Sequence, residues 1–174
     1  DIDFLNRSYR PELEQEDLEG YIHLTTHNRK ADKINEERLK ALPGETLSFS
    51  AEVEGDFPEN NYPVAEQLIL KEKAQVMFIK NDPSGEGKFF NGKIGHVSSL
   101  SQTEIKVKFE DGEEVIVPRY TWENKRFKLN QNTKEIEEKH LGGFTHFPLK
   151  LAWAVTVHKS QGLTFEKAIL DLSG

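Results

Sequence analysis

Hydrophobic residues are spaced along the first part of the chain in a way that predicts a strand, a loop and a helix. The apolar residues 21–24 predict a short strand, and the polar residues 25–28 follow it as a loop. Residues 29–42 then carry apolar side chains at a spacing of about 3.6, which is typical of one face of a helix. Thr26 or Asn28 is the predicted cap, and a Pro-Gly pair ends the helix. This order is typical of the opening of an α/β unit.

From about residue 45 the hydrophobic period changes to two. Residues 47–53 alternate between apolar and polar, and residues 74–80 form a further apolar stretch, so each predicts a strand. Between residues 88 and 129 short strands alternate with turns, including an Asp-Gly pair at 111–112 that is typical of a hairpin. Many short strands within so few residues predict a small β-barrel rather than a sandwich.

The last part of the chain returns to longer elements. Residues 131–140 are polar and compatible with a helix, and the glycines at 142–143 are predicted to break the chain. Residues 149–155 are almost wholly apolar, as expected for one strand that is covered on both faces in a parallel sheet. Residues 168–172 supply another strand. We therefore expect a parallel sheet to be completed here.

Together these patterns predict an α/β fold that is interrupted by an all-β module. Residues 1–78 form the first part of the α/β domain, residues 79–147 the inserted β-barrel, and residues 148–174 the return to the α/β domain. The first twenty residues are acidic and lack an apolar period, so they are predicted to be a polar lead-in. The sequence stops just after the last strand, with no closing helix, which favours a fragment of a longer protein.

Composition removes several classes of function. The 174 residues are 36% hydrophobic, which is enough for a core, and contain no cysteine. Disulfides, thiolate metal sites and cysteine nucleophiles are therefore excluded, and a cytoplasmic location is the natural expectation. No apolar run approaches the ~20 residues that span a bilayer, so we expect no membrane partner.

The net charge of −7 argues against a broad surface for nucleic acid. However, residues 61–174 hold 15 acidic and 16 basic side chains, a net of +1. Any surface that binds a polyanion is therefore predicted to be a local patch in this part of the chain.

A near match to a phosphate-binding loop is rejected. Residues 87–94 fit the pattern G-x-x-x-x-G-K-[ST] except at Ile94, which replaces the magnesium-binding hydroxyl. The pattern also requires a following helix, whereas residues 94–100 are predicted to form a strand. His23 and His27 lie four residues apart without the glutamate of a zinc-binding motif, so we predict no metal site.

The polar segment after residues 149–155 carries the richest chemistry. It supplies hydroxyls, an imidazole, an ammonium and an amide at the carboxyl end of a predicted parallel strand, where ligands of open α/β sheets bind. Donors without a carboxylate suit an anionic ligand, and half or more of protein–nucleic-acid hydrogen bonds go to phosphate and sugar. From composition alone, a polar loop that caps a helix remains the alternative. The residues are Thr156, His158, Lys159, Ser160, Gln161 and Gly162.

Residues 149–164, with the core T-x-H-K-S-Q-G, resemble the fifth motif of superfamily-one DNA helicases of the Pif and RecD kind. Residues 24–28, followed by Ile34-Asn35 and Leu39, are similar to the segment that opens the second motor domain of these enzymes. Residues 89–95 resemble the entry to their inserted SH3-like barrel. The resemblance implies a RecA-like domain of the P-loop NTPase type, without the P-loop, that carries an inserted SH3-like β-barrel.

The resemblance also implies roles for single residues. In this family two RecA-like domains sandwich ATP, and hydrolysis moves the pair along single-stranded DNA. The expected nucleic-acid-binding residues are Thr156, His158, Lys159 and Ser160, and the expected nucleotide-coupling residues are Gln161, Gly162, Asn28 and Arg29. Trp153 is a candidate stacking platform, but its apolar neighbours favour a place in the core. Leu163-Thr164-Phe165 lacks the glutamate with which some relatives touch the ribose.

The implied protein is a fragment of an ATP-dependent 5′-to-3′ DNA helicase. ATP and Mg²⁺ are the cofactors implied for the full-length protein, and single-stranded DNA and an absent first RecA-like domain are the implied partners. The fragment is expected to contain no catalytic residue and to be inactive alone, since the family's phosphate loop, acidic motif and catalytic arginine have no match. Two alternatives stay open: a non-catalytic nucleic-acid- or protein-binding module built on the barrel, and an independent nucleotide hydrolase built on residues 87–94.

Overall fold

The computed structural model describes residue 7 and residues 21–129, 135–163, 165 and 167–171. The predicted polar lead-in, apart from residue 7, lies outside this part of the chain. The described elements are β1 (Ile22–Thr25), α2 (Asn28–Ala41), β2 (Leu47–Ser50), β3 (Glu52–Gly55), η2 (Glu59–Asn61), β4 (Gln67–Leu70), β5 (Gln75–Phe78), β6 (Ile94–Leu100), β7 (Ile105–Lys108), β8 (Glu114–Ile116), β9 (Tyr120–Leu129), β10 (Ile136–His146), β11 (Leu149–Leu151), β12 (Ala154–Thr156), η3 (His158–Ser160) and β13 (Ala168–Asp171). No helix among them is long and apolar enough to cross a membrane.

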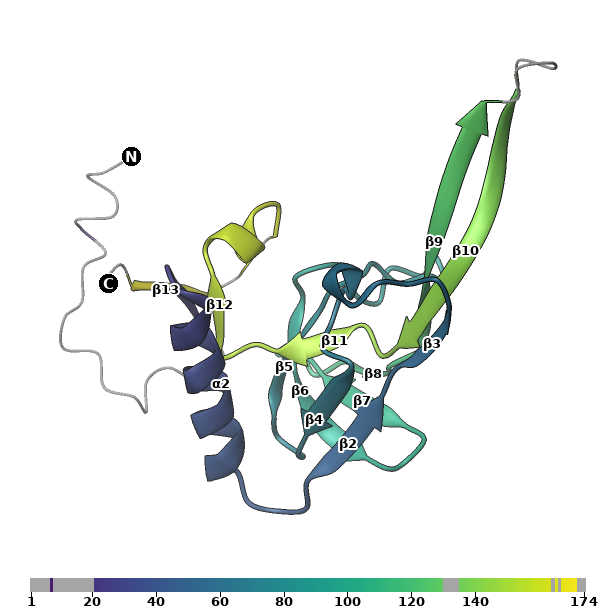
Figure 1. The fold of residues 1–174 in the computed structure, drawn as a ribbon. Helices are drawn as coiled ribbons and strands as arrows, with labels where there is room; N and C mark the ends of the chain where they lie inside the picture. The colour runs from purple at the N-terminus through teal and green to yellow at the C-terminus, as the bar shows by residue number, and fades with distance from the viewer. Residues whose placement is uncertain (1–6, 8–20, 130–134, 164, 166, 172–174) are drawn as a thin grey trace.

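A parallel sheet occupies one end of the molecule, and helix α2 packs beside it (Figure 1). Its strand order is β12-β1-β13, and β1 pairs in parallel with both neighbours. Helix α2 follows β1 directly and buries Ala31 and Leu39. The predicted strand, loop, helix and parallel sheet are therefore confirmed, and they agree with an α/β fold.

The start of α2 differs from the prediction in its cap. The capping residue is His27, which lies between the two predicted residues, and no side chain caps the helix. The hydroxyl of Thr26 instead bonds to Nδ1 of His27 at 2.8 Å. The first backbone N–H groups of α2 are thus left without a side-chain acceptor.

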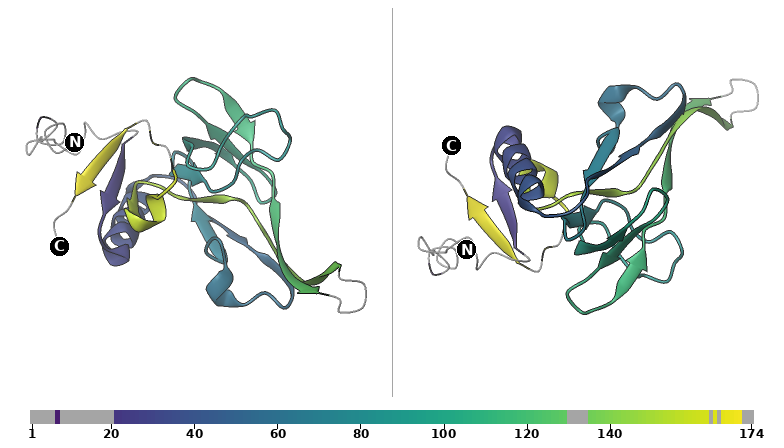
Figure 2. Two further views of the ribbon diagram at one scale, coloured as in Figure 1. Left: turned by 90° about the horizontal axis from the view of Figure 1, so that it is seen from above. Right: turned by 90° about the horizontal axis from the view of Figure 1, so that it is seen from below.

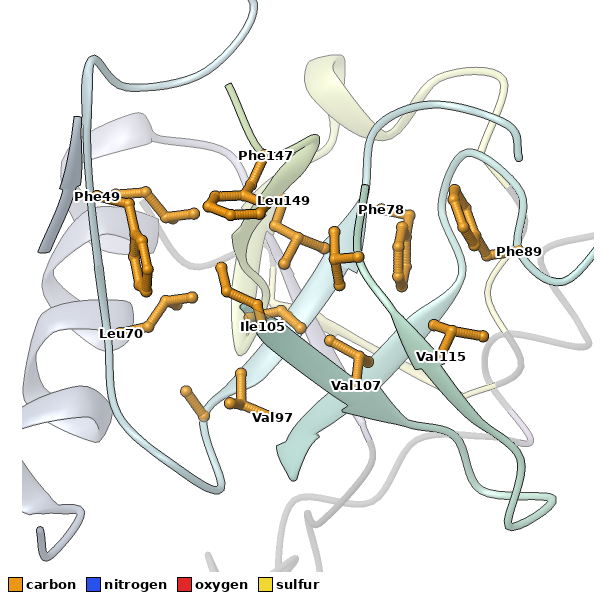
Figure 3. Packing of buried hydrophobic residues seen from close by; sticks show 14 of the residues in the cluster. Phe49, Leu70, Phe78, Phe89, Val97, Ile105, Val107, Val115, Phe147 and Leu149 are labelled. Atoms are coloured by element: carbon orange, nitrogen blue, oxygen red, sulfur yellow. The ribbon is translucent and has the colours of Figure 1, made fainter. Parts of the chain in front are cut away.

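The middle of the chain forms three antiparallel groups of strands. A sheet with the order β11-β5-β6-β7-β8 is the largest; β2 pairs with β4, and β10 lies between β3 and β9. The short strands predicted between residues 88 and 129 include β7, on which Ile105 and Val107 both point inward and are fully buried. These side chains join a continuous core in which the rings of Phe78 and Phe89 stack at 4.1 Å between centroids (Figure 3).

Residues 47–53 form parts of two strands in different sheets rather than one strand. The chain changes sheet at Ala51, whose N–H donates to the carbonyl of Glu66 at 2.8 Å. The alternating pattern therefore does not mark one buried face, since Phe49 of β2 is buried whereas Val53 of β3 is 39% exposed. Strand β4, which pairs with β2, was not predicted.

Residues 149–155 also form two strands rather than one. Strand β11 pairs antiparallel with β5, and β12 pairs in parallel with β1. Only Ala152 and Trp153 separate them. The apolar run is continuous because it passes from one core to a second, in which Met77, Ile94 and the linking Ala152 pack with Ile22 and Val155 of the parallel sheet.

Strand pairing crosses both predicted domain boundaries. Strand β5 lies before residue 79 and β11 lies after residue 147, yet both belong to the five-stranded antiparallel sheet. A segment cut at these boundaries would lose two strands of that sheet.

The predicted helix at 131–140 and the predicted break at 142–143 are wrong over the described residues. Residues 136–146 form the single strand β10, which pairs with β9 in a long hairpin. The hairpin and the parallel sheet lie at opposite ends of the molecule (Figure 2). The pairing shifts register between His140 and Gly142, and a Cβ on Gly142 would lie 2.5 Å from the carbonyl oxygen of Glu54. The glycine therefore permits a close approach of β3 instead of ending the strand.

Candidate nucleic-acid interface

The predicted site residues come from two segments that meet at one edge of the parallel sheet. Strands β1 and β12 end together, with Thr25 and Thr156 in register. The N–H of Val157 donates to the carbonyl of Thr25 at 2.9 Å and fixes the start of η3 beside the end of β1. Because α2 begins just beyond β1, Asn28 lies at this same carboxyl edge, where ligands of α/β sheets bind.

The turn after β12 holds three polar side chains outward. His158, Lys159 and Gln161 are exposed. The hydroxyl of Ser160 is only half-exposed and donates to the carbonyl of Val157 at 2.7 Å, so it stabilises the single turn of η3.

Gly162 allows the chain to leave this turn. Its φ of +77° lies in the left-handed region, which side chains other than glycine rarely adopt. No atom lies within 4 Å of the place where its Cβ would be, so conformation and not lack of space requires glycine here.

A cavity of about 360 Å³ opens at this edge between α2, β4 and the β11–β12 segment. Of the predicted site residues, Asn28, Thr156 and Lys159 line it. Thr156 is only 4% exposed, so it borders the cavity but is otherwise buried. The other predicted residues, Arg29, His158, Ser160, Gln161 and Gly162, are not part of the lining.

Asn35, for which no functional role was predicted, holds the strand that carries Thr156. Its side-chain amide donates to the carbonyl of Ala154 at 2.8 Å, and its side-chain oxygen accepts from the N–H of Ala154 at 2.9 Å. The amide thus replaces a neighbouring strand at the outer edge of β12. Asn35 belongs to the segment that is similar to the opening of the second motor domain, but its hydrogen-bond partner could not be predicted because it lies 119 residues away in the sequence.

Charges around the cavity are unevenly distributed. Lys150 and Lys159 line one side, and Asp32 and Glu36 of α2 line the other. Burial, and then the positive charge of Lys159, lower the pKa of Lys150. The first turn of α2 contains no acidic residue, so the positive end of its dipole is not neutralised there.

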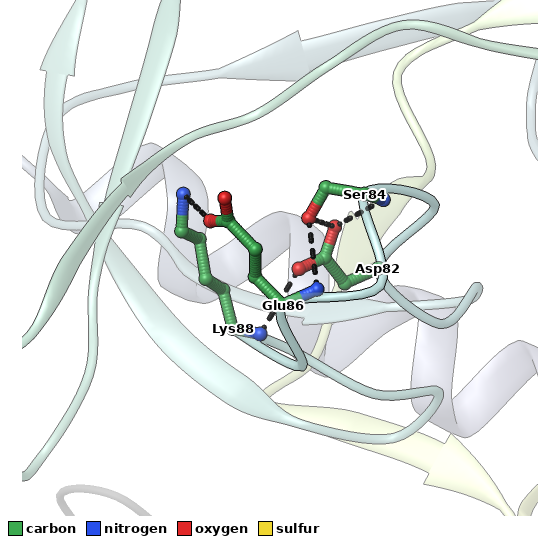
Figure 4. A network of polar contacts seen from close by, with 4 residues as sticks. All are labelled: Asp82, Ser84, Glu86 and Lys88. Carbon is green, nitrogen blue, oxygen red and sulfur yellow. Dashed lines mark hydrogen bonds and ion pairs between the residues drawn. The ribbon is translucent and has the colours of Figure 1, made fainter.

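The near match to a phosphate loop belongs to a turn, as predicted. Asp82 accepts hydrogen bonds from the N–H and hydroxyl of Ser84 at 2.9 and 2.7 Å and from the N–H of Lys88 at 3.0 Å (Figure 4). The pKa of Asp82 is lowered, chiefly by the bonds from Ser84. Ile94 then begins a strand, so no helix end faces the loop. The ammonium of Lys93 lies over the ring of Phe109 at 3.8 Å from its centroid.

The remaining predictions concern Trp153 and the binding of a metal ion. Trp153 is half-buried against the larger core, which supports its interpretation as a core residue. Within the described residues, no group of three or more His, Asp or Glu side chains is arranged to hold a metal ion.

Comparison with known proteins identifies a family. No protein-family model matches the chain. The chain is 30% identical to the ATP-dependent DNA helicase Pif1 of Campylobacter jejuni, over 91% of this chain and 38% of that protein. The crystal structure of Bacteroides sp. Pif1 in complex with ADP-AlF4 superposes with a TM-score of 0.80 and 33% identity, over 99% of this chain and 42% of that one.

A crystal structure of Bacteroides Pif1 bound to ssDNA is similarly close, with a TM-score of 0.72 and 36% identity. It covers 97% of this chain and 38% of that one. The chain therefore spans about two fifths of the length of these relatives.

Proposed function

Since this chain belongs with the Pif1-like helicases of superfamily one, we propose that it is the part of an ATP-dependent DNA helicase that grips single-stranded DNA and forms the second face of the ATP cleft. The remainder of such a helicase would supply the first RecA-like domain with its phosphate loop. Movement in the 5′-to-3′ direction is part of this proposal and follows from the family resemblance.

One observation carries the proposal: two segments far apart in the sequence place hydrogen-bond donors at a single carboxyl edge. Thr156 and Asn28 line the same cavity, and the exposed His158 follows Thr156 on η3. A hydroxyl, an amide and an imidazole beside Lys159 suit the phosphates and sugars of a nucleic-acid backbone. In this assignment Thr156, His158 and Lys159 contact DNA, and Ser160 supports the turn.

The nucleotide side is proposed for Gln161 and Gly162, with Asn28 and Arg29 at the edge of the cleft. These residues belong to the turn after β12 and to the first turn of α2, which the bond from Val157 to Thr25 holds together. When bound, ATP with Mg²⁺ would supply the free energy for movement. DNA and nucleotide would then bias one domain closure, each affecting the affinity for the other.

We also propose that the five-stranded antiparallel sheet, with its adjoining core, corresponds to the inserted SH3-like barrel. Its strands are short, antiparallel and packed around one apolar interior, which supports this assignment. The alternative of a free-standing binding module is less favoured, because residues 79–147 alone lack β5 and β11.

The test uses the longer protein that includes the upstream motor domain. His158→Ala should weaken single-stranded DNA binding roughly tenfold, as expected for loss of one hydrogen bond to a charged group, and should raise the DNA concentration needed to stimulate ATP hydrolysis. His140→Ala, on the exposed part of the hairpin, is the matched control and should have no effect. Undiminished stimulation in His158→Ala would count against the proposed grip.

A further inference from the structure

A second lysine lies beside the proposed DNA-binding turn, on a strand of the other sheet. Lys150 is the central residue of β11 and is in register with Met77 of β5. Cross-strand partners share one face of a sheet, and Met77 packs toward the parallel sheet, so Lys150 faces the same way. Its half-buried side chain lines the cavity together with Thr156 and Lys159.

The two lysines form a pair of like charges without a counter-ion. Among the described residues, Lys150 and Lys159 take part in no ion pair, whereas Lys88 and Lys125, for example, each pair with a glutamate. Burial, and then the charge of Lys159, lower the pKa of Lys150, and the carboxylates of Asp32 and Glu36 belong to the α2 side of the cavity. An anion bound in the cavity that both lysines line would offset the cost of burying the charge of Lys150 and its repulsion by Lys159.

We propose that Lys150 and Lys159 together bind a phosphate group of single-stranded nucleic acid, with the Thr156 hydroxyl as a further donor. This inference rests on the proposed function and extends it, because the DNA-binding surface would then include Lys150 of the antiparallel sheet as well as residues of the parallel sheet. The ligand chemistry is a phosphate diester. The phosphates of ATP are the competing source of a phosphate anion.

The experiment measures binding of the 174-residue chain to a fluorescent oligodeoxythymidylate by anisotropy between 50 and 200 mM salt. Lys150→Met removes the charge and keeps the length of the side chain. Each phosphate contact on a single strand contributes about 0.7 to the slope of log affinity against log salt, so the slope should fall by about 0.7. The ratio of the affinity of the unchanged chain to that of Lys150→Met should therefore fall about 2.6-fold between 50 and 200 mM salt.

Two control variants separate this contact from general charge. Lys150→Arg keeps the cation and should restore the slope. Lys108→Met removes an equal charge from an exposed position on β7 and should leave the slope unchanged. Thermal unfolding supplies a second readout: Lys150→Met should be at least as stable as the unchanged chain, because it removes a repelled, half-buried charge.

The outcomes are distinguishable. An unchanged slope in Lys150→Met, while His158→Ala binds more weakly, overturns this inference and leaves the proposed function standing. Weaker binding together with lower stability, not restored by Lys150→Arg, means a structural role and also overturns it. Loss of binding to fluorescent ATP rather than to the oligonucleotide assigns the pair to nucleotide instead. If the unchanged chain fails to bind the oligonucleotide at 50 mM salt, both the inference and the proposed grip fall.

Discussion

At the scale of single residues, His146 is a buried side chain whose polar atoms have no partner. It is fully buried between Phe144 and Phe147, and both of its ring nitrogens lack hydrogen bonds. Burial, and then the charge of Arg119, lower its pKa to about 4. The folded state therefore contains the neutral imidazole, and protonation opposes folding.

We predict that His146 makes the fold sensitive to acid. The pKa of His146 in the folded state lies below its unfolded value of 6.5. The free energy of unfolding is therefore at its full value above pH 6.5 and decreases as the pH falls towards 4. About 3 kcal/mol should be lost once the pH is below 4. His146→Leu should remove this part of the pH dependence and be at least as stable at pH 7. Urea unfolding at several pH values would show it, and an equal pH dependence in variant and parent would contradict it.

Asn35 makes a different kind of contact, since two backbone groups of the nearly fully buried Ala154 depend on it. We expect Asn35→Ala to lower the free energy of unfolding by about 2 to 4 kcal/mol, because both groups lose their partner. Denaturant unfolding measures this loss. The exposed Asn60→Ala is the control and should change stability little; an equal loss in the two variants would show that the bonds to Ala154 do not stabilise the fold.

The difference between these residues and the motif shows what sequence can reveal at this scale. Thr156, His158 and Lys159 are neighbours in the chain, so their shared chemistry is visible in one segment. Asn35 and Lys150 act through partners distant in sequence or on another element. Periodicity predicts on which side of a helix or strand a residue lies, but it does not predict which residues that side will contact.

At the scale of elements, short strands with alternating side chains were predicted well, while strands defined by their partners were not. β7 and its hairpin turn follow from local pattern. The polar part of β10 has no apolar alternation because it pairs with β9 away from the core, and its residues 136–140 are exposed. The prediction from the apolar run at 149–155 failed for a different reason. A continuous apolar pattern is the same for one buried strand and for two strands in different sheets.

The two adjacent glycines of β10 provide a matched test of the close approach between β3 and β10. A methyl group on Gly142 would meet backbone atoms of Glu54 and Asp56 at 2.5 to 2.7 Å, whereas one on Gly143 meets nothing closer than 3.4 Å. We expect Gly142→Ala to destabilise the fold by about 1 to 3 kcal/mol through overpacking and Gly143→Ala to be neutral or slightly stabilising. Thermal unfolding of both variants checks this, and equal melting temperatures would refute the packing argument.

At the scale of the whole molecule, the two kinds of sheet have separate cores that are joined by hydrogen bonds and by side chains packed from one to the other. The amide of Gln75, which is 1% exposed, donates to the carbonyls of Tyr21 and Ala152 at 3.0 and 2.8 Å. Leu39 of α2 packs into the antiparallel core, and Met77 of β5 packs against the parallel sheet. Periodicity does not reveal these connections, because the residues on both sides of each predicted domain boundary are apolar.

We therefore predict that Gln75→Leu weakens the coupling between the sheets. Two buried carbonyls lose a donor, so the free energy of unfolding should fall by about 1 to 3 kcal/mol. Tryptophan fluorescence and far-ultraviolet circular dichroism should then give unfolding midpoints that no longer coincide. Gln67→Leu, whose hydrogen bonds lie within the β2–β4 pair, should keep a single midpoint. Coincident midpoints in Gln75→Leu would show that other contacts unite the sheets.

The short link of Ala152 and Trp153 decides where mechanical load goes. Traction on the turn after Thr156 would pass along the backbone of β12 and through this link into β11. Antiparallel hydrogen bonds lie across the strand direction, so the three paired residues of β11 would resist such a pull together rather than peel apart in turn. A pull from DNA on this turn would thus be resisted first by the pairing of β12 with β1 and then, beyond the link, by the antiparallel sheet, so both sheets would anchor the DNA-binding turn.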